Sequence, residues 1–169
     1  MTDVDFYTTI ITLTLIYFCM GYALCYAVNN KKPYIKFKTN KVYQKLPTRA
    51  TEGSAGHDFY TSTIVSIPPK EMIVFDTNIV ADIPEGYVLK MYMRSSIGIK
   101  KHLMLANTTS IIDCDYKDTI KAALYNYGDK EVIIKPFERF MQGVCVPYIT
   151  SKQLPLKKER DGGIGSTGR

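Results

Sequence analysis

Two carboxylates and a phenol lie within four residues, at Asp113, Asp115 and Tyr116. A carboxylate can take a proton from water, and a phenol ring can pack against a base or a sugar. A turn that only reverses the chain would favour Asn-Gly or Asp-Gly at its centre. This segment is therefore a candidate catalytic turn, although a surface turn with solvated acids would have the same residue types.

The sequence around the turn predicts a β-hairpin over residues 105–126. Apolar Ile111 and Ile112 lead into the turn, and apolar side chains alternate with others after it, from Ile120 to Leu124. Such alternation is typical of strands that are buried on one side.

Four further segments have residues that could carry chemistry, and three of them suit a phosphorylated ligand. Arg94 is followed by two hydroxyl side chains, a combination that can bind phosphate oxygens. Gln142 offers an amide, and Asp58 lies at the start of a predicted strand. The glycines of residues 162–169 allow backbone N–H groups to approach phosphates, but this segment lacks the Gly-Lys-Ser/Thr ending of a Walker A loop.

The elements that must position these residues are predicted to be strands. From residue 33 onward, short apolar or alternating runs are separated by turn signals about every 8–12 residues. No strong helical period occurs in this part. The pattern predicts one all-β domain over residues 33–156, a sandwich, barrel or jelly roll, followed by a Gly-rich C-terminal arm at 157–169.

The first residues differ from the rest, because residues 6–28 hold no charged side chain. About 20 apolar residues suffice for a helix to span a bilayer. Residues 1–32 are therefore predicted to be an N-terminal membrane anchor with a transmembrane helix. Two alternatives stay open: a buried hairpin of the soluble domain, and an upstream extension from a misassigned start, with Met20 or a later codon used.

The charges on either side of this run predict its orientation. Asp3 and Asp5 precede it without any Lys or Arg, whereas six lysines follow it, at Lys31, Lys32, Lys36, Lys38, Lys41 and Lys45. The positive-inside rule then predicts a cytoplasmic domain and an external N-terminus.

The overall composition limits the kinds of partner and site. The net charge of +6 and the pI near 9.0 suit an anionic partner, which is a nucleotide, a nucleic acid or an acidic lipid. The four cysteines form no Cys-x-x-Cys pair, and the two histidines are far apart. A reducing compartment without a zinc or histidine-based metal site is therefore expected.

Taken in order, the five segments resemble the five motifs of the trimeric dUTPase family (dUTP diphosphatases). The resemblance covers residues 34–169 through LPTRATEGSAGHDFYT, MRSSIGIKK, SIIDCDYKD, ERFMQ and GGIGSTG, and is most specific in Ile112-Asp113-x-Asp115-Tyr116. It implies a distorted jelly-roll β-barrel that assembles as a homotrimer with active sites at subunit interfaces. It also implies hydrolysis of dUTP to dUMP and pyrophosphate with Mg²⁺, with no direct contact to nucleic acid.

The resemblance assigns roles to single residues. Asp113 would activate the water that attacks the α-phosphorus. Asn107 and Ile112 would belong to the uracil subsite, and Tyr116 would stack on deoxyribose and exclude a 2′-hydroxyl. Asp58 would lie near the metal and hold the site together, while the triphosphate and water, rather than the protein, would bind Mg²⁺ directly.

The other substrate-binding residues that it implies are Arg94, Ser95, Ser96, Gln142, Arg160, Ile164, Gly165, Ser166 and Thr167. Those up to Gln142 would face the phosphates. Those from Arg160 onward would close over the nucleotide, commonly on a neighbouring subunit.

The chain departs from the family pattern at three informative positions. Ser110 and Asp118 occupy usual glycine positions near the candidate turn, and Ile164 replaces an aromatic residue that would stack on uracil. Losing a good aromatic contact costs about 1 kcal/mol, so activity with a raised KM is expected. Two other functions remain as alternatives: a non-catalytic dUTP-binding regulatory protein, and a dCTP deaminase, which would need a glutamate base near C4. The divergent C-terminal end favours a viral or phage origin.

Overall fold

The computed structural model describes residues 3–29 and 33–152. The chain divides into two compact units, Met1–Pro33 and Tyr34–Arg169.

The first unit contains one continuous helix, α1 (Asp3–Asn29). From Val4 to Tyr26 every side chain is exposed, and this stretch is long and apolar enough to cross a membrane. Its threonine hydroxyls donate to carbonyls three or four residues earlier, for example Thr12 to Thr8 at 3.0 Å. The predicted helix is therefore confirmed, and the alternative of a hairpin buried in the second unit is wrong.

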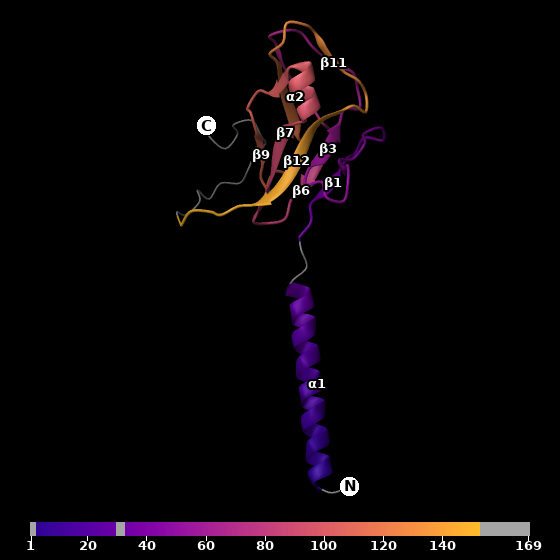
Figure 1. The fold of residues 1–169 in the computed structure, drawn as a ribbon, viewed down its shortest axis with the longest axis vertical. Helices are drawn as coiled ribbons and strands as arrows, with labels where there is room; N and C mark the ends of the chain where they lie inside the picture. The colour runs from indigo at the N-terminus through magenta and orange to yellow at the C-terminus, as the bar shows by residue number, and fades with distance from the viewer. Residues whose placement is uncertain (1–2, 30–32, 153–169) are drawn as a thin grey trace. The chain divides into compact units, whose positions relative to one another are not determined.

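The second unit is built from short antiparallel strands (Figure 1). They are β1 (Lys36–Lys38), β2 (Thr48–Arg49), β3 (His57–Tyr60), β4 (Val65–Ile67), β5 (Met72–Asp76), β6 (Val80–Asp82), β7 (Tyr87–Met93), β8 (Leu103–Leu105), β9 (Ser110–Ile112), β10 (Lys121–Asn126), β11 (Val132–Ile134) and β12 (Arg139–Pro147). The sheets have the strand orders β2-β3-β12-β7-β9, β5-β10-β8, β1-β6 and β11-β4. The expected mostly-β architecture is confirmed.

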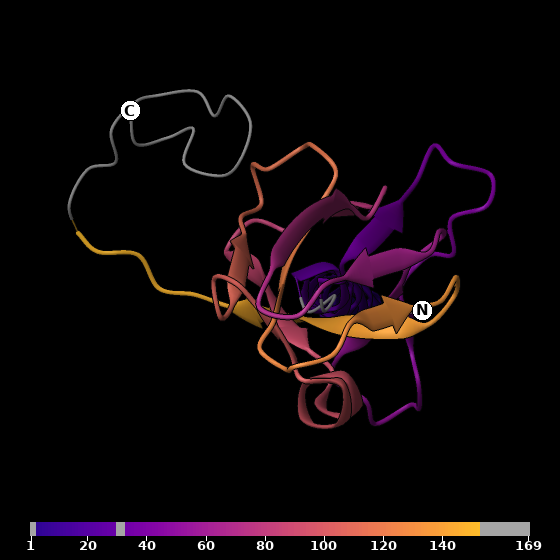
Figure 2. The same ribbon diagram turned by 90° about the horizontal axis from the view of Figure 1, so that it is seen from above.

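One apolar core joins the sheets. In the view of Figure 2 the strands of the second unit are curved rather than flat. Alternation produces this core: in β10 the side chains of Ala122 and Leu124 are buried, whereas that of Ala123 between them is only partly buried. Across the core, the rings of Phe75 on β5 and Phe140 on β12 lie 5.4 Å apart. Side chains from both larger sheets therefore fill one interior, as in packed sheets generally.

The structure departs from the strand pattern at α2 (Ser95–Lys101). The helix begins after extended Arg94 and ends at His102, whose φ of 55° is left-handed. Only Ile97 of this helix is buried. Two turns with one buried residue show no period in the sequence, which is why no helix is expected there.

The predicted hairpin over residues 105–126 is wrong in its pairing around the turn. The ends of this stretch do meet, because Leu105 of β8 pairs with Leu124 of β10. The incoming strand β9 instead pairs with β7, where Ile112 lies opposite Leu89. The strands on the two sides of the turn thus belong to different sheets, because β9 buries Ile112 against the core beside β7.

Candidate active site

A buried carboxylate organises the phosphate-binding candidates. Asp58 on β3 is 5% exposed. Its Oδ1 lies 2.9 Å from Arg94 Nε, and its Oδ2 lies 3.1 Å from Arg139 Nη1. A buried carboxylate is costly without such partners, so Asp58 fixes two guanidinium groups side by side.

Arg94 is positioned by the junction of β7 and α2. Its backbone N–H donates to Phe140 O at 3.2 Å, and its own carbonyl accepts from Ile97 and Gly98, which starts the helix. Ser95 and Ser96 form the exposed first turn of α2. The chain therefore presents the Arg94 guanidinium and two hydroxyl groups at one helix start.

Gln142 lies next to this pair through strand register. On β12 it faces Asp58 on one side and Tyr92 on the other. A Cβ at Gly56 would lie 2.6 Å from Gln142 Oε1, so the glycine leaves the room that this side chain occupies. The structure thus brings Asp58, Arg94 and Gln142 together.

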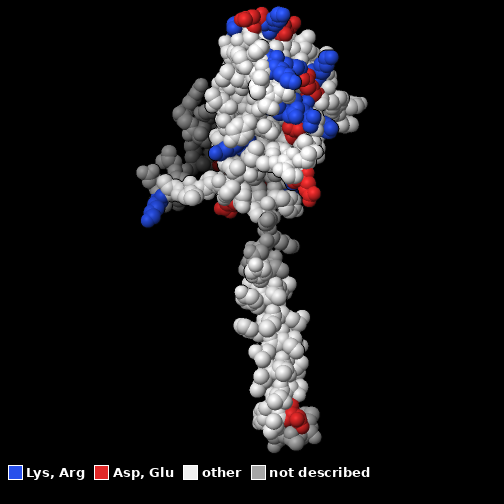
Figure 3. All heavy atoms as spheres, in the orientation of Figure 1, with Lys and Arg blue, Asp and Glu red and all other residues white. Residues whose placement is uncertain are grey.

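Arg139 joins this cluster although the sequence assigns it no role. The available signal was its place in the ERFMQ segment, three residues before Gln142. Figure 3 shows Lys and Arg side chains gathered near α2 with acidic side chains between them. We call Asp58, Arg94, Arg139 and Gln142 with the two serines the phosphate half-site.

The second group of candidates lies at the turn after β9. Tyr116 N–H donates to Asp113 O at 3.1 Å and closes the turn. Asp113 is half-buried, whereas Tyr116 is 8% exposed and its hydroxyl donates to Thr119 O at 2.9 Å. The side chain of Ile112 is also 8% exposed and packs in the core. A bound nucleobase would therefore contact mainly the backbone of Ile112.

Asn107 completes this group, and Ser110 orients it. Ser110 Oγ donates to Asn107 Oδ1 at 3.1 Å, and Ser110 is 9% exposed, whereas Asn107 is exposed. The serine that replaces a usual glycine is therefore in contact with a predicted uracil reader. We call Asn107, Ile112, Asp113 and Tyr116 the uracil half-site.

A tyrosine that the sequence does not single out lies beside the turn. Tyr148 N–H donates to Gly86 O at 3.1 Å. Its interaction with Cys114, then burial, then Asp113 and Glu85 raise the pKa of its phenol. Its position depends on the register of β12 against β7, which no local pattern in the sequence reveals.

The two half-sites lie at opposite ends of β7. Asp113 follows Ile112, which is opposite Leu89 near the start of β7, while Arg94 directly follows its end. The offset is about six residues, or about 20 Å at the rise of a strand. One chain therefore does not bring Asp113 and Arg94 to a common phosphorus atom.

The predicted arm residues Arg160, Ile164, Gly165, Ser166 and Thr167 lie outside the described residues.

Comparison with known proteins relates this geometry to a family. The dUTPase family model matches residues 42–168. A deoxyuridine 5′-triphosphate nucleotidohydrolase of Hydrogenobaculum sp. is 40% identical over 129 residues, covering 73% of this chain and 90% of the relative. The enzyme of that name from Lactococcus lactis is 39% identical over 131 residues, covering 73% and 87%.

Solved structures show the same fold. The dUTPase of Streptococcus mutans superposes with a TM-score of 0.64 at 29% identity, covering 69% of this chain and 98% of that one. A dUTPase from phage phi11 of S. aureus, described with a structural Mg(II) ion, has a TM-score of 0.66 at 21% identity, covering 75% and 98%. These matches confirm the jelly-roll type of fold. With the family model spanning most of the second unit, the chain belongs to the dUTPase family.

Proposed function

We propose that this protein hydrolyses dUTP to dUMP and pyrophosphate, which keeps uracil out of DNA and supplies dUMP for thymidylate synthesis. The observation that carries the proposal is the buried Asp58 that holds Arg94 and Arg139 beside Gln142. This contact brings three of the dUTPase-like sequence motifs together on one anion-binding surface. The chain that carries them belongs to the dUTPase family.

The phosphate half-site binds the triphosphate. The side chain of Arg139 is 43% exposed although one of its nitrogens is bound to Asp58, so its other N–H groups can reach an anion. Arg94 likewise uses Nε for Asp58 and Nη1 for Arg139 O, at 3.4 Å. Fixed donors of this kind stabilise negative charge on the leaving pyrophosphate.

The uracil half-site supplies the general base for the reaction and the hydrogen-bond donor that recognises uracil. Asp113 takes a proton from the water that attacks the α-phosphorus, and Tyr116 packs on the sugar. Because Asn107 Oδ1 already accepts from Ser110, its NH₂ group remains to donate. A donor matches a uracil carbonyl but not the amino group of cytosine, and such unpaired polar groups discriminate strongly.

The site is completed by a second copy of the chain. The two half-sites of one chain lie about 20 Å apart along β7, so the Asp113 of one subunit must meet the Arg94 of another. A closed homotrimer with three such sites satisfies this requirement for every subunit. The arm of residues 157–169, with Arg160, Ile164, Gly165, Ser166 and Thr167, then closes over the nucleotide.

Mg²⁺ fits this arrangement as a cation that arrives with the substrate. Within residues 3–29 and 33–152, no three or more His, Cys, Asp or Glu side chains lie together as a metal cage. Both oxygens of Asp58 already contact arginines. Mg²⁺ binds readily through phosphate oxygens and water, where it offsets the charge of the triphosphate.

The first unit serves as a membrane anchor, with residues 1–32 preceding the barrel at 33–156. Two observations support it: the exposed apolar surface of α1, and threonine hydroxyls that are hydrogen-bonded within the helix. The lysines that follow the helix favour a cytoplasmic catalytic unit and an external N-terminus.

A nucleotide panel tests the hydrolytic function. Full-length protein with Mg²⁺ is incubated with dUTP, dCTP, UTP and dTTP, and pyrophosphate and ammonia are measured. Pyrophosphate from dUTP alone is the expected result. Ammonia from dCTP would identify a deaminase instead, and binding of dUTP without turnover would identify a regulatory protein.

A further inference from the structure

The start of the second unit exposes apolar and basic side chains together. In residues 34–46, Val42 is 91% exposed and Tyr43 is 81% exposed. The surrounding stretch, residues 31–51, contains six lysines and an arginine but no acidic residue. A basic surface that also exposes aliphatic and aromatic side chains is typical of proteins that bind an acidic lipid surface.

A buried glutamine fixes the turn that carries Val42 and Tyr43. Gln44 is 6% exposed, and its backbone N–H donates to Lys41 O at 3.1 Å, which closes the turn. Its side-chain amide donates to Tyr60 O at 3.0 Å, so the turn is held against the end of β3. Neither Val42 nor Tyr43 belongs to the apolar core. Folding does not require an apolar pair at this place, because turns ordinarily carry glycine, proline or polar residues.

The strand before the turn adds outward-facing charge. In β1, Lys36 and Lys38 are exposed, whereas Phe37 between them is half-buried and packs against the core. Alternation therefore directs both ammonium groups away from the core. Among the lysines that the structure describes in residues 34–46, only Lys38 has an acidic partner, Asp82 at 3.7 Å. The other ammonium groups can therefore meet an external anion.

The covalent connection to α1 limits how far this surface can be from a membrane. Four residues separate Asn29, the last residue of α1, from Tyr34. An extended chain of this length reaches about 18 Å, at about 3.6 Å per residue. If α1 spans the membrane, Tyr34 must lie within that distance of the end of the helix. This step rests on the proposed anchor, whereas the binding of lipid by the surface does not.

We propose that residues 34–46 form a docking surface for a membrane that contains anionic phospholipids. Val42 and Tyr43 enter the headgroup region, and the lysines on both sides of them contact the acidic headgroups. None of the half-site residues belongs to this segment. Docking therefore orients the second unit on the membrane surface without taking part in the reaction.

A single introduced tryptophan can report the docking, because the chain has none of its own. Full-length Tyr43→Trp is placed in vesicles of phosphatidylserine and brominated phosphatidylcholine, which quenches the fluorescence of a nearby indole. We expect quenching that weakens at high salt, because salt screens the lysines. The control is Ile99→Trp, at an exposed position of α2, which lies apart from β1 in Figures 1 and 2. Quenching no stronger than in this control would overturn the proposal.

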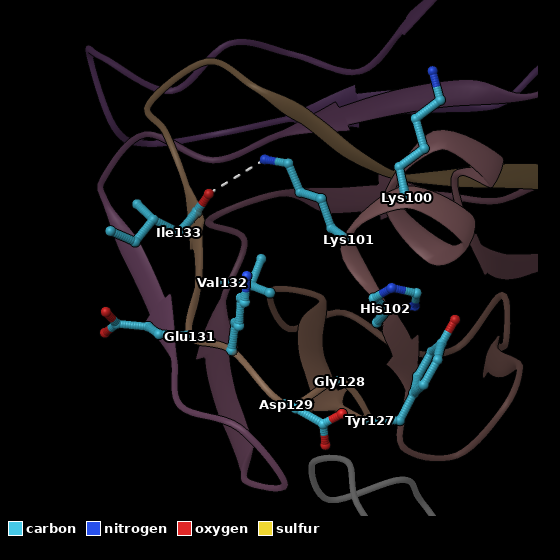
Figure 4. A pocket seen from close by; sticks show the side chains of 10 residues that line it. Lys100, Lys101, His102, Tyr127, Gly128, Asp129, Glu131, Val132 and Ile133 are labelled. Carbon is cyan, nitrogen blue, oxygen red and sulfur yellow. Dashed lines mark hydrogen bonds between the residues drawn. The ribbon is translucent and has the colours of Figure 1, made fainter.

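Matched charge variants test the role of the lysines. In the Tyr43→Trp protein, Lys36→Gln with Lys41→Gln should lower the ratio of docked to undocked protein at least about tenfold, through the loss of two charges. Lys100→Gln with Lys130→Gln removes the same charge elsewhere and should change nothing. Both control lysines are exposed, and Figure 4 shows Lys100 extending away from the other labelled residues. Equal quenching in the two double variants, or in vesicles of phosphatidylcholine alone, would overturn the proposal.

A carbonate wash of the same vesicles separates this inference from the proposed anchor. The wash keeps a protein that is inserted through α1 and releases one that is held only at the surface. Retention without quenching of Tyr43→Trp would overturn the docking and leave the anchor in place. Release after quenching would contradict the anchor and support the docking. A blue shift of the Tyr43→Trp emission that depends on protein concentration, without lipid, would assign the turn to contact between copies and overturn the docking.

Discussion

At the scale of single residues, several side chains near the site act by holding others. Asp58 holds two arginines, and Ser110 holds Asn107. These contacts determine which hydrogen-bond donors of the arginines and of Asn107 remain available to bind the substrate.

Replacing Ser110 with Ala should reduce the discrimination between uracil and cytosine. Without the Ser110 hydroxyl, Asn107 can present its carbonyl oxygen as well as its NH₂ group. We expect the ratio of kcat/KM for dUTP over dCTP to fall about tenfold, near the value of one neutral hydrogen bond. Ser110→Thr keeps the hydroxyl and serves as the control. An unchanged ratio in Ser110→Ala would mean that Ser110 does not orient the amide.

His57 should make stability depend on pH. It packs against Phe37, and its Nδ1 is buried without a hydrogen-bond partner in the described structure. Burial, which is the largest cause, and Arg49 lower its pKa below the ordinary 6.5, and a backbone hydrogen bond with Gly143 only partly offsets them. The unfolded chain therefore binds a proton at a higher pH than the folded one, so this stabilisation is complete above pH 6.5 and is lost as pH falls below it.

Thermal unfolding between pH 5 and 8 measures this effect. The Tm should fall as the pH drops below 6.5, and His57→Phe should flatten that part of the profile. An equally steep profile in His57→Phe would show that other groups cause the dependence.

At the scale of elements, strand register assembles the phosphate half-site. β3, β12 and β7 bring Asp58, Gln142 and Tyr92 into one row, and the end of β7 adds Arg94. The loop before β3 contributes Gly56, which has no side chain and so leaves room for Gln142.

Gly56→Ala should impair substrate binding more than folding. The new methyl would overlap with Gln142 Oε1, which is the end of a side chain that can move away. We therefore expect a Tm within a few degrees of the wild type, as for most substitutions away from the core, and a KM for dUTP raised about tenfold. Gly53→Ala, where a Cβ meets no atom within 4 Å, is the matched control. If KM is unchanged in Gly56→Ala, Gln142 does not contact the substrate in the position seen here.

At the scale of the whole molecule, the separation of the half-sites is the basis for the proposal that two subunits share each active site. Within one chain, Asp113 and Arg94 lie at opposite ends of β7.

Mixing two inactive variants tests this arrangement. Asp113→Asn and Arg94→Ala should each lower kcat by at least about a hundredfold, because one lacks the base and the other a phosphate donor. Random trimers formed from equal amounts of both variants should regain about a quarter of wild-type activity. Each of the two half-sites of an active site is then intact in about half of the cases, so both are intact in about a quarter. Mixing without subunit exchange is the control. Exchange that restores no activity would place both halves on one chain.

Membrane fractionation tests the anchor. Full-length protein should sediment with membranes and resist extraction by high salt, because a spanning helix is held by its apolar surface. Residues 33–169 alone should stay in the soluble fraction. A full-length product that is wholly soluble would contradict the anchor.

The sequence alone was sufficient for the class of fold and for the residue types of the site. Alternation and turn residues reveal strands because they are local, and the spacing of Asp58, Arg94, Asp113 and Gln142 within motifs is local too. The uncharged run at residues 6–28 predicted a helix for the same reason, and α1 confirms it.

Only the tertiary structure decided how these parts meet. Pairing is chosen by burial across sheets, so β9 joins β7 while β10 joins β5 and β8, which no local pattern reveals. The tertiary structure also adds Arg139 to the candidate site, places Ser110 within hydrogen-bond distance of Asn107 and places Tyr148 beside the turn. It also separates the two half-sites along β7, because β9 pairs with the first part of β7 and brings Asp113 there, whereas Arg94 follows the end of β7. The sequence thus supplied the residue types of the candidate site, and the packing of distant strands decided that Asp113 and Arg94 lie at opposite ends of β7.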